Sequence, residues 1–255
     1  MDRMTRTRVS PQDRPGWRMT LYPGAGEAVG SFHGSHDRRP YGGLSEWQGS
    51  ETSTDGVARA ERRARGQVRR FCAEHSLNRL GTLTYAGEGL HEPKRLRRDI
   101  AAFFRALRRE LGRGIPYVWV PEWHPKGHGL HVHFVVGRYI DRGQIVRAWP
   151  HGFVHITLIG DLPAGSGTRE EARRAARYLA KYIGKDTATG RDPDGLHRYE
   201  VAQKYRPAEV VVRAETREGV VAAAAALMGA EPAYTWASAD QDGWEGPPAV
   251  FAQWR

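Results

Sequence analysis

The chain of 255 residues lacks the features that mark several protein classes. Its one cysteine, Cys72, leaves no intrachain disulfide and no cysteine-based zinc site. No run of apolar residues approaches the length of about 18 that a membrane helix needs. Met1 is followed by polar, arginine-rich sequence rather than an apolar signal region. These absences exclude a disulfide scaffold and favour a cytoplasmic protein with no membrane partner.

Acidic residues and lysine are both scarce beside arginine. Lys and Arg together number 39 against 29 Asp and Glu, a formal net charge of +10, and only five of the basic residues are lysines. A high-GC coding sequence accounts for arginine in place of lysine, but not for the net positive charge. Because arginine binds phosphate with two parallel hydrogen bonds, this balance favours a polyanionic partner.

The chain divides into three parts by its pattern. Residues 1–57 are rich in Gly, Ser, Arg and Asp without periodicity, which predicts a largely disordered segment or an arm on DNA. Residues 58–215 alternate helical and strand periodicities. Residues 216–255 read as a helix followed by a tryptophan-containing tail. The order of elements predicts an α+β fold, with a central, mainly antiparallel sheet of about five strands and helices packed on it.

A pair of histidines stands in the strand-like run 129–137. His131 and His133 are two residues apart, so both imidazoles leave the same face of a strand. The residues facing the other way are all apolar: Leu130, Val132, Phe134 and Val136. Glu122 ends the preceding strand, 115–122, and a hairpin brings its carboxylate near both imidazoles.

Two histidines and one carboxylate form a metal site with open positions. His124 and His128 are alternative third ligands to Glu122. Such a ligand set also serves iron oxygenases, and an ordinary surface strand with outward polar residues has the same pattern. A phosphate substrate favours Mg²⁺ or Mn²⁺ as the metal.

A second group lies on the helix expected over residues 168–184. Tyr178, Lys181 and Tyr182 are spaced three and four apart, so their side chains share one helix face. A phenol has a pKa near about 10, and a nearby cation favours the nucleophilic phenolate. Amphipathic packing, with tyrosine at the core edge and lysine in water, explains the same spacing.

Three segments together resemble a known family. They are Gly81-Thr-Leu-Thr-Tyr85, Glu122 followed by Gly129-Leu-His131-Val-His133, and Tyr178-Leu-Ala-Lys181-Tyr182. In this order they resemble the motifs of the rolling-circle replication initiators of the HUH endonuclease superfamily, of plasmid or phage type. Relaxases of that superfamily carry the tyrosine before the histidines. The resemblance covers roughly residues 78–215 and is carried by three ordered motifs.

The resemblance implies an HUH-endonuclease-like fold, related to the ferredoxin and RRM folds. It implies a DNA endonuclease and strand transferase in which His131, His133 and Glu122 hold Mg²⁺ or Mn²⁺. Tyr178 is then the nucleophile that gives a 5'-phosphotyrosine and a free 3'-OH, Tyr182 the candidate second nucleophile, and Lys181 a group that steadies the phenolate or phosphate.

The implied substrate is single-stranded or hairpin DNA at a replication origin. The roughly 40 residues after 215 are too few for a helicase domain, so a host helicase and a host DNA polymerase are the expected partners. Two alternatives stay open: a single-strand transposase of the same superfamily, and a non-catalytic DNA-binding regulator of replication or transcription.

Overall fold

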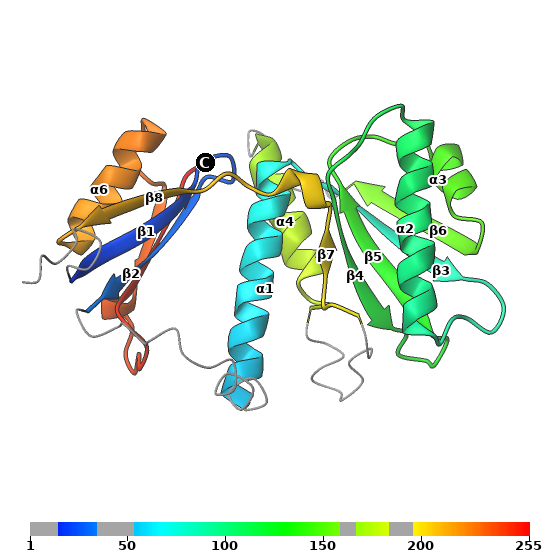
Figure 1. Cartoon of the computed structure of the whole chain (residues 1–255), viewed down its shortest axis with the longest axis horizontal. Helices are drawn as coiled ribbons and strands as arrows, with labels where there is room; N and C mark the ends of the chain where they lie inside the picture. The colour runs from blue at the N-terminus through cyan, green and yellow to red at the C-terminus, as the bar shows by residue number, and fades with distance from the viewer. Residues whose placement is uncertain (1–14, 35–53, 159–166, 184–195) are drawn as a thin grey trace, which may run out of the picture. The chain divides into compact units, whose positions relative to one another are not determined.

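The computed structural model describes residues 15–34, 54–158, 167–183 and 196–255 (Figure 1). The chain forms two compact units. The central unit comprises residues 48–207, and the terminal unit is built from both ends of the chain, residues 1–47 and 208–255.

The central unit contains one antiparallel five-stranded sheet. Its strands are β3 (Arg79–Tyr85), β4 (Tyr117–Trp123), β5 (Leu130–Val136), β6 (Gly152–Leu158) and β7 (Glu200–Val201). Their order across the sheet is β6-β3-β5-β4-β7, so the histidine strand β5 is central. The predicted α+β fold with an antiparallel sheet of about five strands is confirmed for this unit.

Helices cover both faces of this sheet. They are α1 (Thr54–Glu74), α2 (Pro93–Glu110), α3 (Arg142–Ala148) and α4 (Gly167–Leu179), with the short 3-10 helix η2 (Gln203–Tyr205) after β7. One core joins α1 and α4 to strand residues such as Val118, Val120 and Val135. A second core joins α2 and α3 to the opposite face, with Phe134 and Trp119 at its centre (Figure 1). The sheet therefore separates an α1/α4 face from an α2/α3 face.

The terminal unit holds a second antiparallel sheet. It contains β1 (Gly16–Tyr22), β2 (Glu27–His33), β8 (Val210–Ala214), β9 (Tyr234–Ala237) and β10 (Ala249–Gln253), with the helix α6 (Arg217–Met228) and the 3-10 helix η3 (Ser238–Asp240). The strand order is β8-β1-β2-β10-β9. Val220 and Ala224 of α6 pack on one face of the sheet, against Met19, Leu21 and Val250.

The expectation that residues 1–57 lack regular structure is wrong for 16–33. Met19, Leu21 and Ala28 are fully buried in the core beneath α6, and this burial stabilises both strands. The remaining parts of that segment, 1–14 and 35–53, lie outside the described residues. The expected boundary at residue 215 also shifts, because β8 pairs with β1 in the terminal unit.

The C-terminal residues form structure rather than a tail. The expected helix over residues 216–228 is confirmed: Thr216 caps α6 by accepting a hydrogen bond from the Gly219 N–H (3.0 Å), and Gly229 ends it in the left-handed conformation. The last strand, β10, leads to Trp254, which is buried and donates its indole N–H to the Ala230 carbonyl oxygen at 2.8 Å. None of the described helices is long and apolar enough to cross a membrane.

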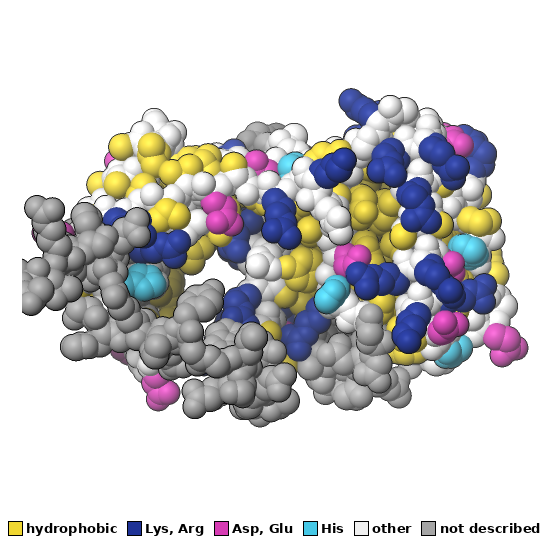
Figure 2. All heavy atoms as spheres, viewed as in Figure 1, with side chains coloured by type: hydrophobic (Ala, Val, Ile, Leu, Met, Phe, Trp, Pro, Cys, Tyr) yellow, Lys and Arg dark blue, Asp and Glu magenta, His cyan; other side chains and the backbone are white. Residues whose placement is uncertain are grey.

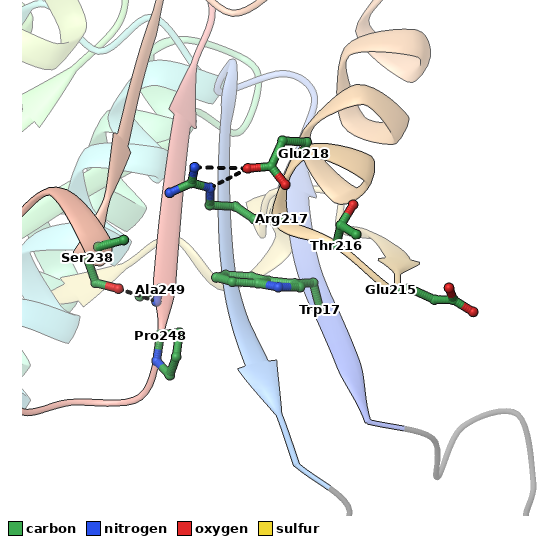
Figure 3. Close-up of a pocket in the computed structure, with 9 residues that line it drawn as sticks. Trp17, Glu215, Thr216, Arg217, Glu218, Ser238, Pro248 and Ala249 are labelled. Carbon is green, nitrogen blue, oxygen red and sulfur yellow. Dashed lines mark hydrogen bonds and ion pairs between the residues drawn. The ribbon is translucent and has the colours of Figure 1, made fainter.

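A pocket of about 400 Å³ lies in the terminal unit at the start of α6 (Figure 3). The indole of Trp17 and the Arg217–Glu218 ion pair (2.9 Å) lie along its wall. The histidines and tyrosines of the sequence motifs do not line this pocket. The search for chemistry therefore turns to the central unit.

Candidate metal and tyrosine site

The strand register places five polar side chains on the α1/α4 face of the sheet. His133 is opposite Thr82 of β3, and His131 is opposite Thr84. On the other side of β5, His131 is opposite Glu122 of β4. Residues directly opposite one another point to the same face. The alternation seen in the sequence therefore brings the histidine motif, the carboxylate and the threonines of the first motif together.

His133 is held at both ring nitrogens. Its Nε2 lies 2.7 Å from Oε2 of Glu122, and both side chains are buried. Its Nδ1 lies 3.1 Å from Oγ1 of Thr82. Because an ionised carboxylate only accepts hydrogen bonds, Nε2 donates to Glu122. Glu122 thus contacts His133, although the strand register sets it opposite His131.

His131 is held at one nitrogen only. Its Nδ1 lies 3.1 Å from Oγ1 of Thr84. Its Nε2 is buried and has no hydrogen-bond partner among the described residues. Burial, followed by the neighbouring His124 and His133, lowers the pKa of His131 to about 4. The ring is therefore neutral at neutral pH, and when Nδ1 carries the proton, Nε2 presents an unshared electron pair, as a metal ligand does.

The other two histidines near the motif are arranged differently. The ring of His124 stacks on that of His131, with 4.5 Å between centroids, and its Nδ1 accepts the backbone N–H of Lys126 at 3.3 Å. Nε2 of His128 lies 3.1 Å from the backbone carbonyl oxygen of Tyr85 and donates to it. The His128 ring is therefore committed to the backbone, while Glu122 faces the histidine pair.

The expected helix over residues 168–184 is shorter in the structure. The α-helical bonds of α4 continue to Ala180, whose N–H reaches the carbonyl oxygen of Ala176. The next N–H groups, of Lys181 and Tyr182, instead reach back only three residues. The chain thus tightens after Leu179, as helix ends often do. Tyr178 lies on the last turn of α4 and Tyr182 on the tighter turn that follows.

This turn places the tyrosines against the histidine strand. The ring of Tyr182 stacks on the ring of His133, with 3.7 Å between centroids and 13° between planes. The Tyr182 hydroxyl donates to the Tyr178 hydroxyl at 3.5 Å, a long hydrogen bond. The Tyr178 side chain is 40% exposed, so a strand of nucleic acid can reach it.

The two phenols differ in their surroundings. Burial, followed by the hydrogen bond with Tyr178, raises the pKa of Tyr182 above its ordinary value. Tyr182 is therefore a protonated hydrogen-bond donor at neutral pH. The ammonium of Lys181 lies 4.8 Å from the centroid of the Tyr178 ring, so its positive charge lies over the more exposed phenol.

The described residues contain no group of three or more His, Cys, Asp or Glu side chains already spaced to hold a metal ion. In the structure His133 and Glu122 bond to each other. The donor set nevertheless fits a metal in its chemistry, because His131 Nε2 is buried without a partner. A metal would replace the hydrogen bond between His133 and Glu122 with two metal–ligand bonds and give His131 Nε2 its missing partner.

Thr82 and Thr84 are the functional candidates that had no individual role in the sequence analysis. The first motif resembled the family only as a block, Gly81–Tyr85. The signal was nevertheless present, because the alternation of Thr82 and Thr84 matches that of His131 and His133 on the neighbouring strand. It becomes readable only once the two strands are known to pair.

The comparisons with known proteins point to DNA replication. A family model described as a replication-associated protein of the ORF2 type matches residues 78–187. The chain is similar to that family over this range, which contains all three motifs. The similarity supports a role in the initiation of DNA replication. The comparisons with curated proteins and with solved structures gave no match.

The replication-associated similarity coincides with one structural part. It begins just before β3 and runs past Ile183, so it takes in the strands and helices that position the histidines and tyrosines. The terminal unit lies outside it.

Proposed function

We propose that this chain is a site- and strand-specific DNA nicking and joining enzyme that initiates rolling-circle replication of a plasmid or phage. The observation that carries the proposal is the stacking of Tyr182 on His133, which sets a pair of phenols beside a pair of histidines. The similarity to replication-associated proteins over residues 78–187 and the net charge of +10 support DNA as the substrate.

In this proposal His131, His133 and Glu122 hold Mg²⁺ or Mn²⁺. The ion, when bound, supplies positive charge to an oxygen of the scissile phosphate. Thr82 and Thr84 fix the ring orientation through the Nδ1 atoms, so that both Nε2 atoms face the site. Glu122 is favoured over His124 and His128 as third ligand because its carboxylate already contacts His133.

Tyr178 is the proposed nucleophile, because it is the more exposed phenol and has a cation over its ring. Its oxygen attacks the phosphorus, and the bond from phosphorus to the 3' oxygen breaks. The phenol proton leaves, the 5' phosphate becomes attached to tyrosine, and the other strand end leaves as a free 3'-OH. Joining is the reverse: the hydroxyl attacks the phosphotyrosine and releases the phenol.

Tyr182 has a different role in the first step. Its raised pKa keeps the hydroxyl protonated, so it donates a hydrogen bond to the Tyr178 oxygen as negative charge develops there. In a second round Tyr182 is the candidate second nucleophile. Unwinding and synthesis after the nick require a host helicase and a host DNA polymerase.

The test uses a supercoiled plasmid that carries the replicon encoding the chain, incubated with protein and Mn²⁺ or Mg²⁺. Denaturing gels then separate free DNA from a covalent protein–DNA adduct. The wild type should nick and form an adduct, and EDTA should abolish both. Tyr178→Phe should form no adduct in the first step. Tyr139→Phe is the matched control, since Tyr139 is 70% exposed and outside the motifs.

Three outcomes distinguish the alternatives. An undiminished adduct in the Tyr178→Phe/Tyr182→Phe double variant would overturn the tyrosine mechanism. Salt-dependent DNA binding without any adduct would instead indicate a non-catalytic regulator. Cleavage restricted to hairpins from transposon ends would indicate a single-strand transposase.

A further inference from the structure

The outward surface of α2 carries a continuous line of positive charge. The helix buries Leu96, Ile100, Phe103 and Leu107 against the sheet. The basic stripe, on the other side of the helix, consists of Lys94, Arg98, Arg105, Arg108 and Arg109, all exposed. Ala101 and Ala102 fill the turn between its two halves and are also exposed. From Lys94 to Arg109 the stripe runs about 22 Å along the helix axis.

The acidic residues of α2 do not neutralise this stripe. Asp99 lies to the side, where it accepts the Tyr85 hydroxyl at 2.9 Å and pairs with Arg95. Glu110 is bound by Arg147 of α3 at 2.9 Å.

Most of the stripe itself is unpaired. Within the part of the chain that the structure describes, Lys94, Arg105, Arg108 and Arg109 form no ion pair. Arg98 has a long, exposed contact with Glu92 at 3.9 Å, which contributes little. Figure 2 shows the resulting concentration of basic side chains over α2.

We propose that the basic stripe binds the phosphate backbone of double-stranded DNA next to the origin strand. The inference rests on the proposed function for the identity of the polyanion as DNA. A rigid row of cations separated by alanine suits phosphates, because phosphate contacts need charge and close approach but no base-specific group.

The composition of the stripe favours a duplex over a single strand. Proteins that bind single strands combine positive charge with aromatic rings on which bases stack. The exposed residues of α2 are Lys, Arg, Ala and Glu, with no aromatic ring among them. The stripe therefore offers backbone contacts without a stacking platform.

The position of α2 separates this surface from the proposed chemistry. The helix belongs to the core on the α2/α3 face, whereas His131 and His133 point to the α1/α4 face. A strand held at the tyrosines therefore does not lie along the stripe. The stripe contacts a different stretch of the same DNA, and its loss should leave the reaction on short single strands intact.

The experiment measures binding of the full chain to DNA in EDTA, so that no strand is cut. Fluorescence anisotropy follows a labelled duplex of mixed sequence and a single strand of the same length over a series of KCl concentrations. The variant is Lys94→Gln/Arg105→Gln/Arg109→Gln, which keeps good helix formers at exposed positions. The matched control, Lys204→Gln/Arg206→Gln/Arg213→Gln, removes the same charge from exposed sites elsewhere.

The stripe variant should lower the slope of log K against log salt for duplex by about 2 to 3, with a smaller change for the single strand. The control should change the duplex slope by much less. Arg105→Lys/Arg109→Lys, which retains the charge, should bind duplex like the wild type. Equal losses in stripe and control variants, or an equal loss for both forms of DNA, would overturn the proposal. Because no cutting is measured, failure of the tyrosine mechanism leaves this result unaffected.

Discussion

The ring of Tyr182 lies nearly parallel to the ring of His133, with 3.7 Å between their centroids. This contact joins the end of α4 to the central strand of the sheet, although the two residues are 49 positions apart in sequence. It also fixes where the neighbouring phenol lies, because the hydroxyls of Tyr182 and Tyr178 are 3.5 Å apart. The tyrosine motif therefore acts through one stacked ring and one exposed ring.

The two rings predict different results for tyrosine variants. Tyr182→Phe keeps the stacked ring and removes only the hydroxyl that donates to Tyr178. Loss of one hydrogen bond of about 1 kcal/mol predicts a roughly fivefold slower formation of the covalent adduct in single-turnover reactions. Tyr182→Ala removes the ring as well and should slow the reaction further. Equal rates for the Phe and Ala variants would contradict a role for the stacked ring.

Glu122→Gln tests the third ligand. The substitution keeps the size of the side chain but removes its charge, so the proposed Mn²⁺ site should weaken by at least tenfold. His124→Ala and His128→Ala should change Mn²⁺ affinity by less than Glu122→Gln does. Titration of free Mn²⁺ by electron paramagnetic resonance measures the affinity directly, without DNA. A larger loss in His124→Ala than in Glu122→Gln would assign the third position to His124.

Thr82→Val and Thr84→Val test the groups behind the histidines. Each variant keeps a β-branched side chain on β3 but removes the hydroxyl that contacts Nδ1. Loss of such an outer contact typically weakens metal binding by about 10- to 100-fold. The measurement is again Mn²⁺ affinity, and Thr→Ser at either position should restore it.

Thr157→Val is the matched control for this pair. Its hydroxyl lies 2.9 Å from Nε2 of His155, a threonine–histidine contact on the edge strand β6. Its removal should leave Mn²⁺ affinity unchanged. A similar loss in Thr157→Val would show that the threonine effect is general rather than local to the site.

Local periodicity was enough to predict much of the central unit. The apolar spacing of α2 matches the residues that are buried, and the alternation in β5 separates its apolar side chains from its histidines. The hairpin of β4 and β5 also follows from neighbouring segments. Side-chain choice within that hairpin was not predictable, because Glu122 is opposite His131 in register yet bonds to His133.

The terminal unit was missed because its pairing is not local. The first strand, β1, pairs with β8, whose residues lie about 190 positions later, and β2 pairs with β10. Each strand is short, and Gly30 interrupts the apolar alternation of β2 where it packs against Met19 and Val250. The burial that stabilises these strands exists only after both ends of the chain have met. A window along the sequence contains no trace of it.

The close packing at Gly81 yields a prediction about stability. A Cβ atom at this position would lie 2.2 Å from the ring of Phe134, which is fully buried on the neighbouring strand. Gly81→Ala should therefore destabilise the central unit by about 1–3 kcal/mol, as overpacking does. Urea unfolding measures the change through the midpoint.

Phe134→Leu supplies the control for that mechanism. It removes the ring that the new methyl group would contact, so the Gly81→Ala/Phe134→Leu double variant should be less destabilised than the sum of the two single changes. Gly66→Ala, in the middle of α1, should shift the midpoint the other way, because alanine stabilises a helix interior by up to about 1 kcal/mol. Additive effects of Gly81→Ala and Phe134→Leu would mean that the glycine is required for a reason other than contact with this ring.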